Sequence, residues 1–365
     1  MIKEYIDKKT NKKMYEIVGE YIGKNLLTGK EKRIKKKGFK SKKEANLYIA
    51  RKKMEFESDC SILPENTTFE SLFNIWFDSK KHTLSSSTIY GIKRDRKNYL
   101  FPKLASLPVK KINKLYIQNI FNNFLSDELN LSTATMKVLK VQLQSIFEYA
   151  VDAELIHKNP VKKIIVPKKD AKVKKVFTKD ELKFLLEKGK TELSQNYYIY
   201  ARLLAFTGAR PGEIAALQIT DFDSKKLEVT INKTISRNEN GNYYIKNKPK
   251  NQHSVRTSKI DKDTIDMVFE YMRNKKISGR LFSNRNYIYF GHHLKKFLQK
   301  HNLPLVTPHG FRRTHATLLS EANVPVKAIQ AQLGHANITT TLDIYTQVTE
   351  KQKNDTIISF KKHIS

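Results

Sequence analysis

The spacing of the apolar residues changes twice along this chain of 365 residues, and these changes limit what it can fold into. Apolar and polar side chains alternate over 15–21, as in a half-buried β-strand. Over 69–150 apolar side chains recur every three to four residues, as on one face of a helix. From Thr178 onward both patterns occur. Polar stretches at 58–66 and 162–175 read as linkers between these regions. We therefore predict three domains: 1–60, 64–165 and 170–365.

The N-terminal region is typical of a small sheet followed by one helix. Strands are predicted over 15–21 and 32–38, with a Thr-Gly turn between them. Ser41 and Glu44 have the spacing of a capping box, in which each side chain bonds the backbone N–H of the other residue. A helix is predicted to begin there.

The middle region, 64–165, predicts a domain made of helices. Its first helix carries an apolar stripe with the spacing i, i+3, i+4, i+7: Phe69, Leu72, Phe73 and Trp76. Similar stripes predict helices near 89–100, 120–125 and 139–150. The polar faces carry a group of basic residues that contact either phosphates or only solvent: Lys93, Arg94, Arg96 and Lys97.

The C-terminal region, 170–365, predicts helices around a small sheet. A capping box at Thr178 opens one helix, and an apolar helix follows over 197–206. The Asn-Gly pair at 240–241 is typical of a hairpin turn. Three strand-like runs lie near it: 227–235, 243–246 and 255–260. From Asp263 onward the pattern is helical. The predicted fold class is mainly α with small β elements (α+β).

The charge of the chain points to a polyanionic partner. It has 69 basic and 36 acidic side chains, a formal net charge of +33, and every region shares the excess. Such an excess repels itself in a compact state, and binding a nucleic acid relieves that repulsion. The alternative is a lysine-rich coding bias that implies no partner. A single cysteine, Cys60, excludes an intrachain disulfide, and no apolar run is long enough to cross a membrane. A cytoplasmic protein is expected.

Two short motifs in the C-terminal region present basic residues in tight turns. Arg210 follows Thr-Gly-Ala, where one helix is predicted to end at Gly208 and the next to begin at Pro211. Its backbone is therefore fixed. Lys250 lies in the predicted turn between the second and third strands.

Two further motifs follow near the end of the chain. Thr307 is a candidate N-cap, and behind it His309 and Arg312 share one helical face because they are three residues apart. A Leu-Gly-His triplet ends at His335, and Tyr345 follows it. Each of these residues alone is more often structural or a surface residue than catalytic.

Taken together, in this order and spacing, the motifs resemble the tyrosine recombinase (phage integrase) family, of the temperate-phage or conjugative-transposon type. The family pattern of Arg, Lys, His-x-x-Arg, His and Tyr matches six residues: Arg210, Lys250, His309, Arg312, His335 and Tyr345. The stretches Thr-Gly-Ala-Arg-x-Gly-Glu and Leu-Gly-His are specific signatures. One departure is that Arg313 and His315 follow Arg312, where many members of the family place a histidine directly after the arginine.

The resemblance implies a phosphodiester transfer that uses no cofactor. Tyr345 is the expected nucleophile, and Arg210 and Arg312 are expected to contact the non-bridging oxygens with forked donors that a lysine lacks. Fixed positive charge at the phosphate removes the need for a metal. In agreement, the sequence has no acidic cluster with metal-ligand spacing and no Gly-rich phosphate loop.

The remaining residues receive supporting roles from the same resemblance. His309 is the candidate base for the tyrosine, and His335 is expected to hydrogen-bond the phosphate. Lys250 is expected to protonate the departing 5′ oxygen, with Lys246 and Lys248 as alternatives on the same strand and turn.

The resemblance also implies an architecture and partners. It predicts an N-terminal arm-binding domain, a helical core-binding domain and a tyrosine recombinase catalytic fold. The partners are double-stranded DNA at crossover and arm-type attachment sites, a homo-tetramer on that DNA, an excisionase and a host DNA-bending protein. Residues beyond the nucleophile pack either on a neighbouring protomer or on their own domain: Ile357, Ile358 and Phe360.

Two other functions remain open at this point. A type IB topoisomerase shares the chemistry but relaxes supercoils alone, and the separate basic N-terminal region favours recombination over it. A non-catalytic DNA-binding protein is the other alternative, and the complete set of six residues argues against it.

Overall fold

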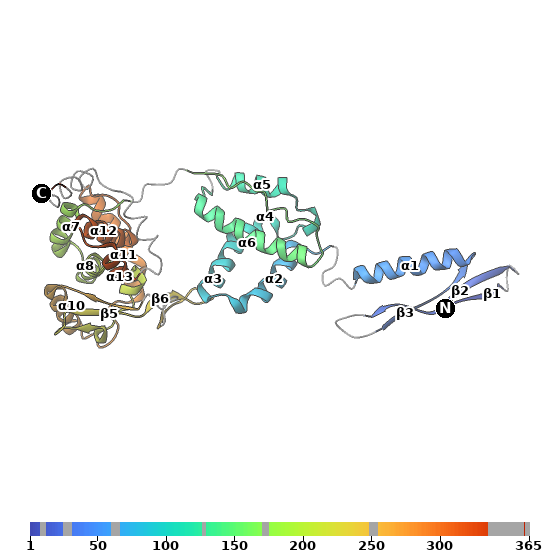
Figure 1. Ribbon diagram of the computed structural model, residues 1–365, viewed down its shortest axis with the longest axis horizontal. Helices are drawn as coiled ribbons and strands as arrows, with labels where there is room; N and C mark the ends of the chain where they lie inside the picture. Colours follow the sequence, from blue (N-terminus) through green and yellow to red (C-terminus); the bar gives the residue numbers. More distant parts are fainter. Residues whose placement is uncertain are drawn as a thin grey trace. The chain divides into compact units, whose positions relative to one another are not determined.

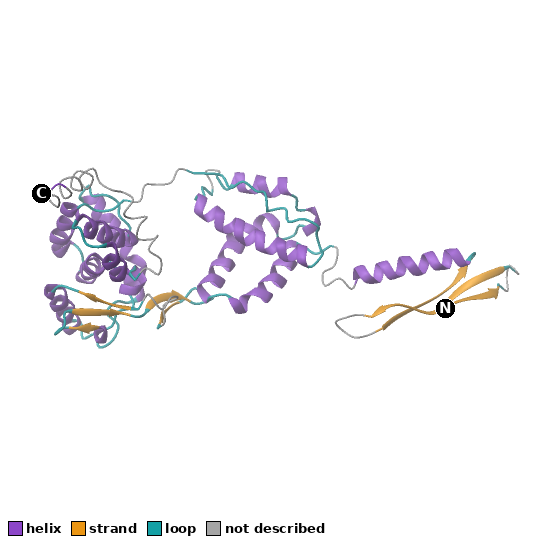
Figure 2. Cartoon of the chain, in the orientation of Figure 1, coloured by secondary structure: helices purple, strands orange, loops and turns teal. Residues whose placement is uncertain are grey.

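The computed structural model describes residues 1–7, 12–24, 31–59, 66–125, 129–169, 175–247, 255–334 and 361. The chain forms two compact units, Met1–Asp170 and Ala171–Ser365 (Figure 1). Helices dominate, and the strands form small antiparallel sheets (Figure 2). The predicted α+β class is confirmed. None of the described helices is long and apolar enough to cross a membrane.

The N-terminal part of the first unit is a three-stranded antiparallel sheet with one helix against it. The sheet has the order β1 (Ile2–Ile6), β2 (Lys13–Lys24), β3 (Glu31–Phe39), and helix α1 spans Lys42–Asp59. Four buried side chains from β2, β3 and α1 form its core: Ile17, Phe39, Ala45 and Ile49. Strand β1 was not predicted from the sequence.

The alternation predicted along β2 is wrong in its second half. Tyr21 was expected on the buried side, yet 42% of it is exposed, while its neighbour Ile22 is 5% exposed. The register against β3 shifts between Ile17 and Glu20, where Gly19 has a φ of +63°. This irregularity reverses the side-chain direction of the residues that follow.

The rest of the first unit is a helical core domain. Its helices are α2 (Phe69–Lys80), α3 (Ser86–Asp95), α4 (Phe101–Leu104), α5 (Lys114–Asn123) and α6 (Thr133–Asp152). The predicted stripe of α2 is fully buried in this core. Side-chain hydroxyl or amide oxygens cap the N-termini of the longer helices: Thr68, Ser85, Asn113 and Ser132.

The predicted linker over 162–175 begins later than expected. Ile164 is buried in the helical core, and the amide side chain of Gln118 makes two hydrogen bonds of 2.9 Å with the backbone of Ile165. At least three of the four basic residues predicted on the polar faces also have protein partners, one of them being Lys93, whose Nζ lies 5.9 Å from the ring centre of Phe77. Arg94 pairs with Asp95, and the Arg96 guanidinium lies 4.7 Å from the ring centre of Phe101.

The second unit is built around helix α8, most of whose residues are buried. Its helices are α7 (Lys179–Glu192), α8 (Gln195–Thr207), α9 (Pro211–Ile214), α10 (Lys262–Asn274), α11 (Asn284–Lys300), α12 (Pro308–Glu321) and α13 (Val326–Leu333). The capping box predicted at Thr178 is present. Helix α8 contributes nine buried residues, and α7, α10, α11 and α12 pack around it.

The strands of this unit form two sheets, whereas the sequence predicted one. The sheets are β4 (Phe222–Asp223), β5 (Glu228–Ile231) and β8 (Arg256–Lys259), and the hairpin β6 (Thr234–Arg237) with β7 (Tyr243–Lys246). The strand-like run 227–235 is divided between β5 and β6. Strand β8 therefore pairs with β5 and not with the hairpin.

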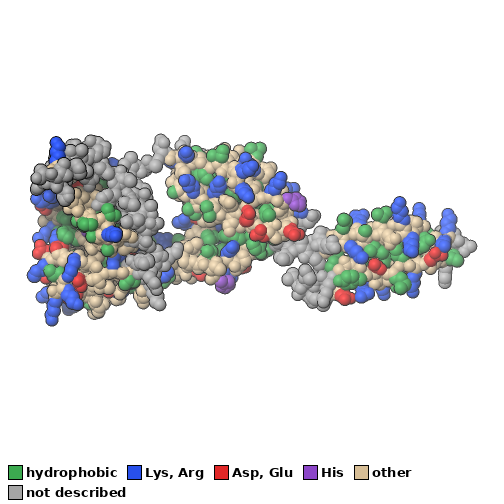
Figure 3. Space-filling view, viewed as in Figure 1, with side chains coloured by type: hydrophobic (Ala, Val, Ile, Leu, Met, Phe, Trp, Pro, Cys, Tyr) green, Lys and Arg blue, Asp and Glu red, His purple; other side chains and the backbone are tan. Residues whose placement is uncertain are grey.

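Lysine and arginine side chains are spread over both units on the face that Figure 3 shows. The described residues contain no group of His, Cys, Asp and Glu side chains that could hold a metal ion.

Candidate active site

The turn that carries Arg210 is fixed by its neighbours. Helix α8 ends at Gly208 with a φ of +60°, and a Cβ there would lie 2.5 Å from the His315 ring and 2.8 Å from Leu333. Only glycine fits both the conformation and the space. On the other side, the hydroxyl of buried Tyr200 donates to the carbonyl of Pro211 at 2.5 Å, which joins α8 to the start of α9.

The Arg210 side chain is held on one side and open on the other. Its Nη1 donates to Glu213 Oε1 at 2.8 Å, and its backbone N–H donates to Glu213 Oε2 at 2.9 Å. The arginine side chain remains 40% exposed, while the Glu213 side chain is only 4% exposed. The guanidinium can therefore meet a phosphate from solvent with the N–H groups that Glu213 does not use.

Helix α12 supplies His309 and Arg312. As predicted, Thr307 caps this helix, accepting the Gly310 N–H at 3.2 Å. Arg312 is buried, and it donates to the Gly208 carbonyl at 3.1 Å and to the Leu333 carbonyl at 2.7 Å. It thus joins the ends of α8 and α13, two elements that are far apart in the sequence.

Burial and neighbouring positive charges change the pKa values of His309 and Arg312. Burial lowers the pKa of His309, and the nearby guanidinium groups of Arg210 and Arg312 lower it further. A neutral imidazole is therefore favoured at neutral pH. Burial, with Arg210 and Arg256 beside it, lowers the pKa of Arg312 to about 9, which still leaves this side chain protonated at neutral pH. The structure thus brings three of the six predicted residues together.

Two residues of this cluster were not predicted to take part. Glu213 is buried, which by itself raises its pKa, but Arg256 and Arg210 together bring that pKa below its ordinary value. The carboxylate is therefore ionised among three arginines. The spacing of Glu213, three residues after Arg210 in the same motif, was a usable signal. Arg256 lies at the start of β8, and the sequence gives no signal for it.

The other three predicted residues, Lys250, His335 and Tyr345, lie outside the described residues, and their roles stay predictions. The last described residue before His335 is Gly334, which ends α13 in a left-handed conformation with a φ of +66°. Gly334 directly follows Leu333, whose carbonyl group accepts from Arg312.

His315, part of the departure from the family pattern, lies next to the Gly208 turn. Its Nδ1 is 2.8 Å from the Ala205 carbonyl, which makes Nδ1 the protonated nitrogen. Burial lowers the pKa of His315, so the ring is neutral at neutral pH. It packs against the Gly208 turn and is part of the support of the site.

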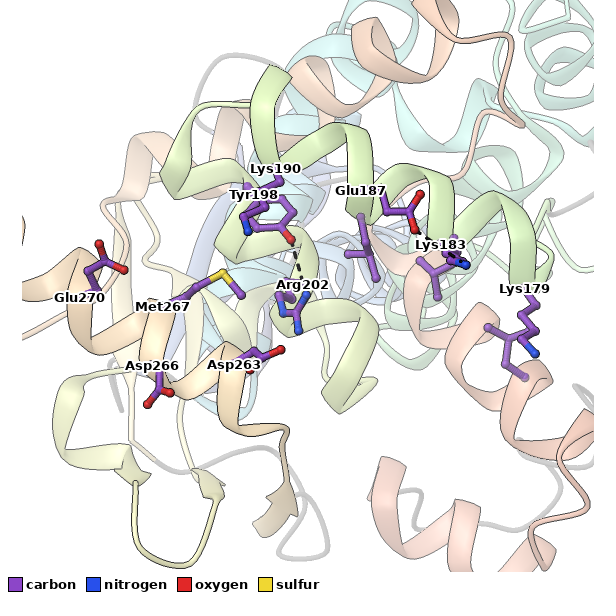
Figure 4. Close-up of a pocket in the computed structure, with 13 residues that line it drawn as sticks. Lys179, Lys183, Glu187, Lys190, Tyr198, Arg202, Asp263, Asp266, Met267 and Glu270 are labelled. Carbon is purple, nitrogen blue, oxygen red and sulfur yellow. Dashed lines mark hydrogen bonds and ion pairs between the residues drawn. The ribbon is translucent and has the colours of Figure 1, made fainter.

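A groove elsewhere in the same unit does not suit a phosphate. It has a volume of about 700 Å³ and lies between α7, α8 and α10 (Figure 4). Lysines on α7 line one side, but three carboxylates on α10 line the other: Asp263, Asp266 and Glu270. These carboxylates would repel a DNA strand. None of the residues that line the groove belongs to the arginine cluster.

Comparison with known families gives one match for each region. Residues 175–352 match the phage integrase family, residues 68–126 match the SAM-like N-terminal domain of phage integrases, and residues 5–55 match an arm DNA-binding domain.

Individual relatives agree with these matches. A tyrosine recombinase XerC-like protein of Caldanaerobacter subterraneus is 29% identical, over 87% of this chain and 89% of its own length. The ICEBs1 integrase of Bacillus subtilis is 25% identical, over 84% of this chain and 86% of its own length.

Solved structures share the fold. The Tn1549 transposon integrase in complex with a circular intermediate DNA has a TM-score of 0.67 at 23% identity, over 80% of this chain and 99% of that one. The lambda integrase tetramer bound to a Holliday junction has a TM-score of 0.58 at 17% identity, over 93% and 94% of the two chains. With an arginine-rich cluster at the predicted place and family matches along the chain, this protein belongs to the phage integrase family of tyrosine recombinases.

Proposed function

We propose that this protein is a site-specific DNA recombinase, an integrase that cuts and rejoins double-stranded DNA to integrate and excise a mobile element. The observation that carries this proposal is the cluster of Arg210, His309 and Arg312 around the single carboxylate of Glu213. The cluster holds more positive than negative charge, and an anionic phosphodiester bound there would balance the excess positive charge.

The two arginines suit a phosphate whose charge increases during attack. Each guanidinium has five N–H donors. Arg312 uses two nitrogens to bind carbonyl groups, and Arg210 uses one to bind Glu213, so both retain N–H groups for the non-bridging oxygens. Because these donors are fixed before the reaction, they stabilise the developing charge without reorganisation.

The proposed reaction is a transesterification. The Tyr345 hydroxyl loses its proton to neutral His309 and attacks phosphorus, so that a 3′-phosphotyrosyl bond forms while the bond to the 5′ oxygen breaks. Lys250 protonates that oxygen. A 5′ hydroxyl of the partner duplex reverses the step, which needs no ATP because the phosphotyrosyl link keeps the energy of the original bond. His335 adds a hydrogen bond to the phosphate.

The assembly is also part of the proposal. The lambda integrase structure is a tetramer on a Holliday junction, and the Tn1549 integrase is bound to a circular intermediate DNA. We infer that four copies of this chain act on two duplexes at crossover sites, with the C-terminal segment around Ile357, Ile358 and Phe360 joining neighbouring protomers. An excisionase and a host DNA-bending protein are the expected accessory partners in the cytoplasm.

One experiment separates this proposal from its alternatives. The protein is incubated with a duplex nicked just beyond the crossover point, so that the short fragment carrying the new 5′ hydroxyl diffuses away and the covalent 3′-phosphotyrosyl adduct accumulates. Formation of an adduct excludes a non-catalytic DNA-binding protein. Joining of two different duplexes then distinguishes a recombinase from a topoisomerase, which relaxes a supercoiled plasmid but joins no partner strand.

Residues 1–63 are expected to bind DNA by themselves, at a different site from the rest of the chain. They carry 18 basic and 9 acidic side chains, and their sheet and helix have a core of their own. On β3, the Lys37 side chain pairs with Glu16, and the Lys36 Nζ lies 4.4 Å from the ring centre of Tyr48. Lys35, Lys36 and Lys37 are all exposed, so each can meet a phosphate.

The test is to titrate residues 1–63 with arm-type and crossover-type duplexes at several salt concentrations. If Z phosphates are neutralised, the logarithm of the affinity should fall with the logarithm of the salt concentration with a slope of about −0.9Z. The alternatives are a dimerisation domain or a structural cap. Equal preference for both duplexes, or no binding at low salt, would exclude the arm-reading role.

A further inference from the structure

Arg256 connects two parts of the site, Glu213 beside the Arg210 turn and the last turn of α13. It is the first residue of β8, and its side chain is 6% exposed. Its Nη2 donates to Glu213 Oε2 at 2.9 Å, and its Nε donates to the Gln332 carbonyl at 2.9 Å. One side chain thus contacts the Arg210 turn through Glu213 and contacts the last turn of α13 directly.

The contact with Glu213 decides how Arg210 is presented. Glu213 Oε1 accepts from the Arg210 side chain, while Oε2 accepts from the Arg210 backbone and from Arg256. A buried carboxylate needs full compensation. Without Arg256, Arg210 would be the remaining guanidinium bound to Glu213, and its exposed side chain would be drawn onto both carboxylate oxygens and away from a phosphate.

The contact with Gln332 holds the last turn of α13 in place. The last carbonyl groups of a helix have no partner within the helix. Arg256 binds the carbonyl of Gln332, and Arg312 binds that of Leu333, the next residue. Two arginines from different elements therefore fix the final turn of α13 against the site.

We propose that Arg256 is a positioning residue for recombination: it holds Glu213 so that Arg210 faces the scissile phosphate, and it anchors the end of α13 beside the same phosphate. This inference rests on the proposed function. A merely structural ion pair is the competing explanation, and the chain offers a matched example. Arg202 on α8 binds Asp261 at 2.6 Å and Thr264 at 2.5 Å, is half-buried, and lines the groove of Figure 4 away from the arginine cluster.

The test compares Arg256→Met with Arg202→Met in the full chain, using the nicked duplex. At saturating DNA, Arg256→Met is expected to slow single-turnover adduct formation about 100-fold, the scale of a small misplacement of a catalytic group. Its dissociation constant for the duplex should stay within about threefold of wild type, because Arg256 itself is buried. Arg202→Met should also lower the melting temperature, because it leaves Asp261 without its cation, but it should leave the rate per folded molecule within about threefold.

Two further measurements separate positioning from stability. If Arg256 acts through Arg210, the double variant Arg210→Lys/Arg256→Met should be faster than the product of the two single effects predicts, since coupled residues are not additive. Arg256→Lys keeps a charge for Glu213 but cannot also reach the Gln332 carbonyl in the same way, and it should recover part of the rate.

Hydrogen exchange gives a readout that does not depend on cleavage. Amide protection over 326–334 should fall in Arg256→Met and stay unchanged in Arg202→Met. If the wild-type protein forms no adduct, the proposed function fails, and this exchange measurement still tests the anchoring of α13. An Arg256→Met variant with a near-normal rate, fully additive effects or unchanged exchange would overturn the positioning role.

Discussion

Tyr345→Phe is expected to abolish covalent attachment to DNA while leaving DNA affinity within about threefold of wild type. The substitution removes one phenolic oxygen, the atom that bonds to phosphorus, and keeps the ring. Tyr345 is the tyrosine that follows Leu-Gly-His in the family pattern, within the segment that matches the phage integrase family. Because phenylalanine keeps the aromatic ring and packs much as tyrosine does, the rest of the chain should still bind DNA.

The measurement is denaturing electrophoresis of the protein on the nicked duplex, with binding followed in parallel under native conditions. Tyr289→Phe is the matched control, because Tyr289 is an exposed tyrosine of α11 in the same unit. That variant should form adduct at the wild-type rate. A phosphotyrosyl adduct in Tyr345→Phe would show that another of the 17 tyrosines is the nucleophile.

Local patterns explain why much of the fold could be predicted. Helices can be predicted from apolar stripes and capping residues, because these signals lie within a few residues of each other in the sequence. The stripe from Phe69 to Trp76 and the capping box at Thr178 are examples. The Arg210 turn was predictable for the same reason. Its determinants, Gly208 and Pro211, are its immediate neighbours, and both take the places expected of them.

Features that depend on distant parts of the chain could not be predicted in this way. The pairing of β8 with β5 is not visible in either strand, and it is this pairing that carries Arg256 toward Glu213. The role of Arg256 also requires α13 to pack beside β8. Gln332, the residue of α13 that Arg256 contacts, lies 76 residues further along the chain. The exposure of Tyr21 depends on a register shift against β3. Each of these outcomes is decided by tertiary contacts.

The same distinction applies to the six predicted site residues. The residues were identified from the order and spacing of motifs in the sequence, whereas only the folded structure can show that they lie close together. The structure supplies that grouping for Arg210, His309 and Arg312, since α8 and α12 pack against each other and the carbonyls of Gly208 and Leu333 both accept from Arg312.

Arg210→Lys and Arg312→Lys are each expected to slow single-turnover cleavage by about 10²–10³-fold, the usual effect of removing one fixed donor to a developing oxyanion. Lysine keeps the charge but presents its donors from a single nitrogen, so it cannot span two oxygens as a guanidinium does. DNA affinity should change little, because the charge remains and the chain has many other basic residues that can neutralise DNA phosphates.

The two variants should differ in stability, and this difference tests the geometry of the site. Arg210 is 40% exposed and its loss leaves Glu213 paired with Arg256, so Arg210→Lys should unfold at nearly the wild-type temperature. Arg312 is buried and bridges the Gly208 and Leu333 carbonyls, which one ammonium group cannot do, so Arg312→Lys should also be destabilised. Arg202→Lys is the control for a half-buried, ion-paired arginine outside the site, and it should cleave normally. A rate close to wild type for either Arg210→Lys or Arg312→Lys, measured on folded protein at saturating DNA, would mean that the scissile phosphate does not lie at this cluster.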